Sequence, residues 1–339
     1  MIKRVISLFL IISFVLFSVS CENKNDKLLT KTYYQYFDTV TTVKIYNSNK
    51  DFNKICNSFE SNVLKKYNQL FDIYKTYKGI SNIKTINDNA GIKRIKIDSE
   101  LTDFLLCCKK MYQKTSGNVN VCLGPVLKIW HKFRNEGKKV PSLNDLKNAN
   151  RYSSIENLKV NKEKNTAYLA KKGCSIDVGA IAKGYVADKI YSFLLSKNVK
   201  NAIVDFGGNI ITVGKKTNGE NFSVGITNPD NKSENTVTLK CKNGLIISTS
   251  GDYERFYEVN GKKYSHIISP KTLFPTEKNK SVTVISKSGY LADTLSTALF
   301  ILNYKEGLEL VNKYNDCYAL IIDSSTKLHY SNGFKKFLK

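Results

Sequence analysis

The sequence predicts an α+β fold with a largely antiparallel sheet that is flanked by helices. Two observations predict this class. Helical and strand segments do not alternate regularly, as they would in a doubly wound parallel sheet. Short β-branched and aromatic segments separated by turn residues dominate the second half of the chain, which is typical of hairpins. The 339 residues show no internal repeat and no linker after residue 30, so we expect one compact, bilobed domain over residues 33–339.

The N-terminus carries the pattern of a signal peptide. Lys3 and Arg4 precede an apolar run over residues 5–17, and small residues then lead to Cys21. This order predicts a signal peptide over residues 1–20, because the run is too short for an ordinary membrane-spanning helix.

Small residues directly before a cysteine are typical of a bacterial lipobox, in which Cys21 becomes the lipidated N-terminus. The position three before the cysteine, usually Leu, is Ser18 here, and plain export is the alternative. The polar residues 21–32 are expected to form a tether. We therefore expect a lipid-anchored protein on the extracytoplasmic face of the bacterial inner (plasma) membrane.

The first half of the chain predicts one strand and two long helices. Residues 39–46 are β-branched and aromatic, which indicates a strand. Apolar residues recur at three- and four-residue steps over 52–74, which predicts a helix. Residues 81–91 are rich in Asn and Gly and are expected to be a loop. A strand over 92–97 and a helix over 101–112 follow.

The middle of the chain mixes turns with short elements. Residues 118–125 are irregular, and Ser142 with Asp145 indicates a capped helix start. Residues 160–169 predict a hairpin. Residues 174–188 predict a short strand that enters a helix through a turn of small residues.

The remaining segments are mostly strands. The pair Asn260-Gly261 is a strong hairpin signal, and residues 291–302 predict a helix of small apolar residues. The strands are expected over 202–206, 222–226, 236–240, 245–248, 256–259, 263–268, 281–285 and 318–322.

The net charge of +24, from 53 Lys and Arg against 29 Asp and Glu, raises the possibility of an anionic partner. The excess is nearly all Lys, spread along the chain and accompanied by abundant Asn, Ile and Tyr. An A/T-rich genome explains this composition, so we expect no nucleic-acid site. The eight cysteines have no spacing typical of zinc and are expected to be buried thiols.

Four groups of residues could carry chemistry. One of them, Ser248 through Arg255, is rich in hydroxyls and ends in an Arg that could line a polar pocket, and a strand-ending turn is the alternative. The turn that holds Asp177 and Lys183 presents free N–H groups at a helix start, which suits an anion, although a plain turn with two solvated charges explains it equally well. Asp293 and Thr297 share a helix face and offer two hard oxygen ligands for Mg²⁺; a hydrogen bond on a helix surface is the alternative. His266, one of three histidines, ends a strand before a proline and is a candidate general base.

Taken together, these segments resemble the ApbE family of FAD:protein FMN transferases over roughly residues 33–312. The matching segments in chain order are Phe37-Asp38-Thr39; Ser81 to Asn87 after Tyr77; Ser116-Gly117-Asn118 through Gly124-Pro125 and Trp130; Asp177 through Gly184; Gly207-Gly208-Asn209; Thr249-Ser250-Gly251; and Ala292 through Thr297.

The resemblance implies an ApbE-like, T-fold-related architecture and a Mg²⁺-dependent enzyme. Such an enzyme cleaves FAD, attaches FMN through a phosphoester bond to a threonine of a target flavoprotein subunit of the Rnf or Nqr type, and releases AMP. By position, Ala180 (through its carbonyl), Asp293 and Thr297 would hold the metal, and His266 would deprotonate the threonine. The residues that would contact FAD are Phe37, Tyr77, Asn118, Val119, Asn120, Asp177, Lys183 and Ile268.

Three positions depart from the family pattern. Asn120 and Ser269 stand where the family has Asp, and Leu273 stands where it has Gly. Two alternatives stay open: a Mg²⁺-dependent hydrolase that gives FMN and AMP, and a non-catalytic flavin-binding surface lipoprotein.

Overall fold

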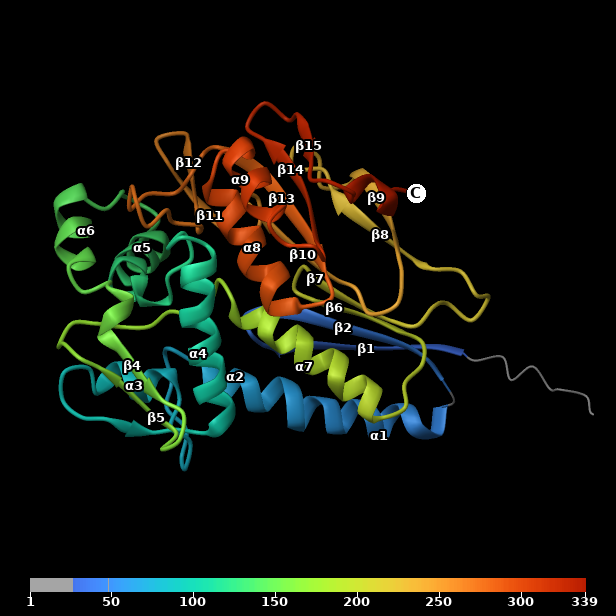
Figure 1. Cartoon of the computed structure of the whole chain (residues 1–339), viewed down its shortest axis with the longest axis horizontal. Helices are drawn as coiled ribbons and strands as arrows, with labels where there is room; N and C mark the ends of the chain where they lie inside the picture. Colours follow the sequence, from blue (N-terminus) through green and yellow to red (C-terminus); the bar gives the residue numbers. More distant parts are fainter. Residues whose placement is uncertain (1–26, 48) are drawn as a thin grey trace, which may run out of the picture.

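The computed structural model describes residues 27–47 and 49–339. Its centre is an eight-stranded sheet in which every neighbouring pair is antiparallel (Figure 1). The strands in spatial order are β1 (Lys27–Tyr36), β2 (Thr39–Asn47), β6 (Ala202–Phe206), β7 (Asn209–Val213), β10 (Ile246–Gly251), β13 (Asn279–Ser286), β14 (Cys317–Asp323) and β15 (Leu328–Tyr330).

Both faces of this sheet are covered. Helices α7 (Ala182–Ser196) and α8 (Gly289–Ile301) lie side by side on one face, where Leu295 packs with Val282 and Val284. The hairpin of β8 (Phe222–Thr227) and β9 (Asn235–Cys241) covers the other face together with the C-terminal 3₁₀ turn Phe334–Phe337. The central strands are therefore buried on both sides, which explains their long apolar runs.

A second group of elements lies beside α7 and α8 (Figure 1). It contains α3 (Ile83–Asp88), α4 (Ser99–Lys114), α5 (Gly124–Glu136), α6 (Leu143–Asn150) and the small sheet of β3 (Ile95–Lys96), β5 (Thr166–Leu169) and β4 (Leu158–Asn161). The hairpin of β11 (Phe256–Val259) and β12 (Lys262–Ser265) packs against α5 through Trp130.

Most predicted elements are confirmed, including the strand over 39–46, the cap of α6 by Ser142 and the turn at Asn260. Several expectations are wrong, three of them in the first third of the chain. Residues 27–32 of the predicted tether belong to β1, because they pair along their length with β2. The helix predicted over 52–74 comprises α1 (Asn49–Phe59), a π-helical stretch (Glu60–Lys65) and α2 (Lys66–Phe71), so it ends three residues early.

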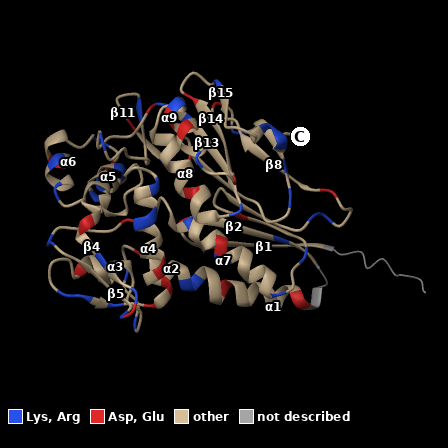
Figure 2. Ribbon diagram, viewed as in Figure 1, with Lys and Arg blue, Asp and Glu red and all other residues tan. Residues whose placement is uncertain are grey.

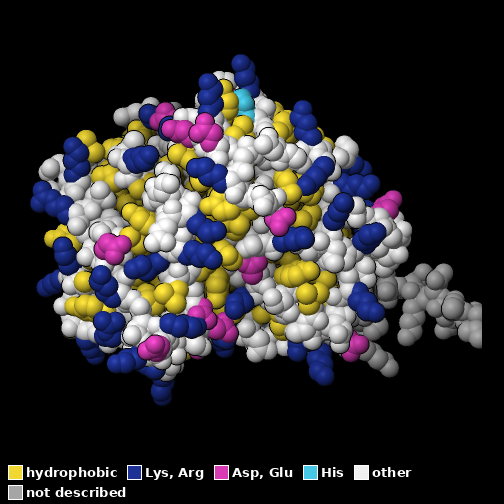
Figure 3. Space-filling view, in the orientation of Figure 1, with side chains coloured by type: hydrophobic (Ala, Val, Ile, Leu, Met, Phe, Trp, Pro, Cys, Tyr) yellow, Lys and Arg dark blue, Asp and Glu magenta, His cyan; other side chains and the backbone are white. Residues whose placement is uncertain are grey.

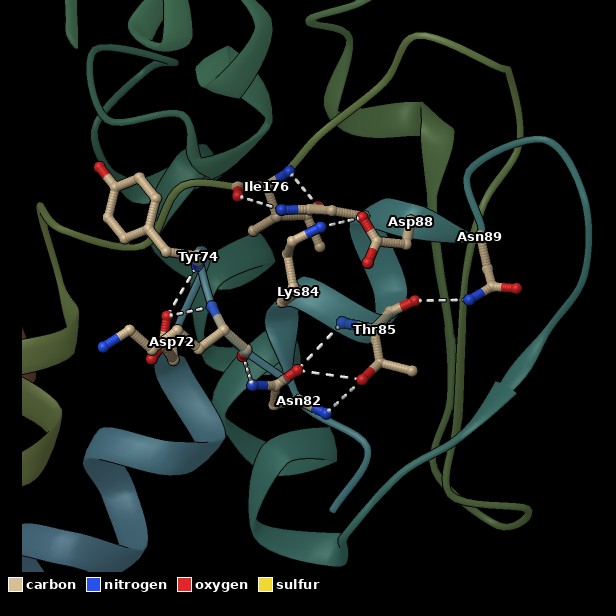
Figure 4. Close-up of polar contacts among 10 residues, drawn as sticks. Asp72, Tyr74, Asn82, Lys84, Thr85, Asp88, Asn89 and Ile176 are labelled. Atoms are coloured by element: carbon tan, nitrogen blue, oxygen red, sulfur yellow. Dashed lines mark hydrogen bonds and ion pairs between the residues drawn. The ribbon is translucent and has the colours of Figure 1, made fainter. Parts of the chain in front are cut away.

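The third error is the loop predicted over 81–91, which contains α3. The side chain of Asn82 accepts a hydrogen bond from the Thr85 N–H, and the Thr85 hydroxyl accepts one from the Asn82 N–H (Figure 4). This capping box stabilises a helix that the Asn-rich composition concealed. The sequence also did not predict β7, β15 or α9 (Tyr304–Val311).

Lys and Arg side chains are scattered over all parts of the molecule (Figures 2 and 3). They are not gathered on one helix or one sheet edge. Within residues 27–47 and 49–339, no helix is both long enough and apolar enough to cross a membrane.

Candidate active site

The segment before Asp177 was predicted to be a strand, but it has no strand partner. Instead, the side-chain amide of Asn87 donates to the Ile176 carbonyl at 2.9 Å, and its oxygen accepts from the Ile176 N–H at 2.7 Å (Figure 4). The Asp177 N–H donates to the carbonyl of Val121 at 2.8 Å. These contacts fix the extended chain that enters the turn. They also give a structural role to Asn87, the last residue of the segment 81–87 that resembles the family.

The turn itself is closed by Asp177, whose Oδ1 accepts the Gly179 N–H at 3.0 Å. Helix α7 then starts at Ala182, and Ile181 before it provides no side-chain cap. The free N–H groups predicted at this helix start are largely used within the protein, because the Ala182 N–H donates to the Val178 carbonyl at 2.9 Å and the Gly184 N–H donates to Asp293 at 2.7 Å. Lys183 turns toward the sheet, where its Nζ donates to the Gly207 carbonyl at 2.7 Å.

Helices α7 and α8 meet at Asp293. The Gly184 N–H donates to its Oδ2 at 2.7 Å, whereas its Oδ1 has only a 3.4 Å contact with the amide of Asn209. Burial raises the pKa of Asp293, and the nearby Lys183 ammonium acts in the opposite direction. A buried carboxylate with an incompletely used oxygen can accept a further ligand.

The predicted metal ligands fit Mg²⁺. Thr297 lies one helical turn after Asp293 and is within 3.5 Å of the Ser250 hydroxyl, and Ala180 packs against the apolar cluster that includes α8. One carboxylate, one hydroxyl and one carbonyl are hard oxygen donors, and Mg²⁺ takes few such ligands from protein. In the described residues no three His, Cys, Asp or Glu side chains cluster as a metal site.

His266 is held from the hairpin β11–β12. Its Nδ1 lies 3.1 Å from the Arg255 carbonyl, which also accepts the His266 N–H at 3.0 Å. A carbonyl can only accept, so Nδ1 carries the proton and Nε2 keeps its lone pair. The pKa of His266 falls from its usual 6.5 to about 4: burial is the largest cause, the hydrogen bond to the Arg255 carbonyl acts against it, and the cations Arg255, Lys183 and Arg134 add to the lowering. The imidazole is therefore neutral at pH 7, as a general base must be.

Two aromatic side chains that the sequence did not assign lie beside Asp177. His131 Nε2 is 3.8 Å from Asp177 Oδ2, and His131 Nδ1 is 3.1 Å from the hydroxyl of Tyr74. Tyr74 follows the end of α2 and is 62% exposed. The periodic pattern had placed it on a buried helix face, which concealed this position. The guanidinium of Arg255 donates to the Asp38 carbonyl at 2.7 Å.

Three of the residues expected to contact FAD differ in what their side chains already contact within the protein. Phe37, at a φ of 58°, packs edge-on against Phe206 at 5.1 Å between ring centroids. The Tyr77 hydroxyl donates to Asp72 at 2.7 Å. Asn118 is buried, and its Oδ1 has no hydrogen-bond partner among the described residues.

Val119 and Ile268, two further residues expected to contact FAD, are apolar, and their buried side chains leave little surface for a nucleotide. Val119 is buried in the cluster that contains α8. The Ile268 side chain is buried with Trp130 and Leu273, so only its main chain remains for a nucleotide.

The structure gives each of the three departing residues a defined contact. Asn120 caps Cys122 through its oxygen and donates its amide to the Ser153 carbonyl at 2.8 Å, which a carboxylate could not do. The Ser269 hydroxyl accepts N–H groups of the following turn, and His266 is oriented by Arg255 instead. Leu273 adopts a φ of 66°, and its carbonyl accepts the indole N–H of Trp130 at 2.8 Å.

A sequence model of the ApbE family matches residues 37–321. The chain belongs to the ApbE family. Among curated ApbE relatives, the FAD:protein FMN transferase of Haemophilus influenzae is 32% identical over 270 residues, which cover 77% of this chain and 78% of that protein. The enzyme of the same name from Klebsiella pneumoniae is 27% identical and covers 80% and 83% of the two chains.

Solved ApbE structures share the fold. The Thermotoga maritima ApbE protein superposes with a TM-score of 0.83 at 25% identity and covers 92% of this chain and all of its own. The flavin transferase ApbE from Vibrio cholerae gives 0.79 at 24% identity, covering 92% and 99%. These comparisons confirm the predicted family, the predicted α+β fold and the assignment as a transferase.

Proposed function

We propose that this protein is a Mg²⁺-dependent FAD:protein FMN transferase that joins FMN to a threonine of a target flavoprotein subunit and releases AMP. The observation that carries the proposal is His266, a half-buried imidazole whose Nδ1 is held by the Arg255 carbonyl at 3.1 Å, so that Nε2 keeps its lone pair. The nearby cations Arg255 and Lys183 favour its neutral form. Lys183 also acts on the pKa of Asp293, so base, cation and metal-binding carboxylate belong to one site. Curated relatives that bear this activity support the assignment.

The chemistry follows from these groups. His266 Nε2 takes the proton of the threonine hydroxyl, a weak nucleophile without a base. The hydroxyl oxygen bonds to the FMN phosphorus, the phosphoanhydride bond breaks, and AMP leaves with the bridging oxygen. Lys183 neutralises charge on the phosphates. Mg²⁺, held by the Ala180 carbonyl, Asp293 and Thr297, supplies further neutralisation when bound.

The test combines purified protein, FAD, Mg²⁺ and a co-expressed redox subunit of the Rnf or Nqr type. We expect AMP in solution and a threonine of the subunit that carries the mass of FMN. AMP without this adduct would indicate a hydrolase. FAD binding without AMP at any Mg²⁺ concentration would indicate a non-catalytic flavin-binding protein. The variant Asp293→Ala is expected to abolish transfer because it removes the one charged metal ligand.

We also propose that the protein is a lipoprotein anchored through Cys21. The cysteine lies outside the described residues, and the small residues before it in the sequence support the proposal. In a bacterial host, the wild-type chain should be recovered in the membrane fraction. Cys21→Ser should be released into the soluble extracytoplasmic fraction, and recovery of both proteins in the same fraction would refute the anchor.

A further inference from the structure

Helix α8 begins without a cap from its own segment. Ser288, which precedes it, makes no capping bond through its side chain. The first N–H groups of a helix need acceptors from outside the helix. Here the two carboxylate oxygens of Asp188, on α7, accept the first two N–H groups of α8. Its Oδ1 accepts the Gly289 N–H at 2.6 Å and its Oδ2 accepts the Tyr290 N–H at 3.0 Å.

The contact is reciprocal. Gly184 lies one turn before Asp188 on α7, and its N–H binds the carboxylate of Asp293, which lies one turn after Gly289 on α8. Each helix thus provides one carboxylate and receives one. The backbones touch, because a Cβ atom on Gly184 would lie 2.3 Å from the Gly289 carbonyl oxygen, and one on Gly289 would lie 2.4 Å from the Gly184 carbonyl oxygen.

We propose that Asp188 is a positioning residue for the metal-binding carboxylate. Asp188 holds the first turn of α8 against α7. It thereby fixes the position of the Asp293 carboxylate relative to the Gly184 N–H and to the metal. This inference rests on the proposed function, since it assumes that Asp293 binds the cation. Partners that orient a metal ligand typically change metal affinity or activity 10–100-fold when they are removed.

The experiment measures Mn²⁺ binding to the purified protein by electron paramagnetic resonance, without FAD, beside the Mg²⁺ dependence of AMP release. For Asp188→Ala we expect the Mn²⁺ dissociation constant and the half-saturating Mg²⁺ concentration to rise roughly 10–100-fold. Asp188→Asn keeps one acceptor oxygen, so it should give a smaller rise, and it provides the measurement if the alanine variant does not fold.

The control is Asp98→Ala. Asp98 also caps a helix, through the Glu100 N–H at 2.7 Å, but on α4. It should lower the melting temperature without changing Mn²⁺ affinity. Equal Mn²⁺ affinity in wild type and both Asp188 variants would overturn the inference. A wild-type protein that binds no Mn²⁺ and releases no AMP would instead overturn the proposed function.

Discussion

At the scale of the residue, the site depends on side chains that are held by main-chain groups. His266 is oriented by the Arg255 carbonyl, and Lys183 by the Gly207 carbonyl. Main-chain positions are fixed by the fold, so these side chains are ordered before a substrate arrives. Such preorganisation lowers the cost of reaching the reactive geometry.

The depressed pKa of His266 makes a prediction about pH. A general base works when it is deprotonated, so activity falls as the pH drops through the pKa in the folded protein, which is about 4 rather than the usual 6.5. The profile of kcat/KM for FAD at saturating Mg²⁺, which reports the free enzyme, should show no loss of base function between pH 8 and 6. An acidic limb near 6.5 that disappears in His266→Ala would contradict this.

Asn87 makes a second prediction at this scale. Asn87→Ala leaves the N–H and the carbonyl of Ile176 without partners, so the free energy of unfolding should fall by about 2 kcal/mol. Because the turn at Asp177 loosens, FAD affinity should fall as well. Denaturant titration and FAD titration measure the two effects.

The matched control for that experiment is Asn89→Ala, which removes a single bond to the Thr85 carbonyl at the end of the same helix. It should cost less stability and leave FAD affinity unchanged. Unchanged FAD affinity in Asn87→Ala would show that Asn87 serves only the fold.

At the scale of the element, the site is the junction of α7 and α8. Both helices carry glycine at the point of contact, because no side chain fits between the two backbones. Close approach brings the Gly184 N–H to Asp293 without an intervening group.

Gly184→Ala tests this junction. The added Cβ would lie 2.3 Å from both the Gly289 carbonyl oxygen and Asp293 Cβ, so the helices must separate. We expect a loss of roughly 1–3 kcal/mol in the free energy of unfolding, measured by denaturant titration, together with weaker Mn²⁺ binding.

Gly307→Ala in α9 is the matched control, because the nearest atom to its added Cβ is the flexible end of Ile321 at 3.0 Å. Ala also favours a helix over Gly. This variant should change the free energy of unfolding little. An equal loss of stability in both variants would show that the close contact between α7 and α8 does not cause the loss in Gly184→Ala.

Local sequence patterns predicted most helices and strands. They could not predict the contacts between distant segments that form the site. The turn at Asn260 and the cap at Ser142 depend on neighbours in sequence and were therefore predictable. Asn87 and Ile176 are 89 residues apart, and Gly184 and Asp293 are 109 apart. No periodicity relates such pairs, so only resemblance to a family indicated that their segments act together.

At the scale of the whole molecule, the described cysteines form no disulfide. Six are buried and Cys107 is intermediate, and burial raises the pKa of Cys107 to about 11. The fold is therefore held by its apolar clusters without covalent links, although the predicted location is outside the cytoplasm.

This makes a prediction for thiol chemistry. A reductant should leave the melting temperature unchanged, because the described cysteines form no disulfide that it could reduce. A water-soluble thiol reagent should leave the buried cysteines unmodified in the folded protein and label them all in denaturant. Rapid labelling of several thiols without denaturant would show that the core opens more readily than its packing indicates.

The length of β1 has a consequence for the acceptor. Its ten residues, Lys27–Tyr36, rise about 33 Å toward the turn at Phe37. With the proposed lipid on Cys21, the six residue steps from Cys21 to Lys27 add at most about 20 Å. If Cys21 carries the lipid as proposed, the Phe37 end of β1 can lie at most about 50 Å from the membrane surface. If the proposed threonine transfer also holds, the acceptor threonine would have to lie within this distance of the membrane, so the length of the anchoring segment would limit which subunits can be modified.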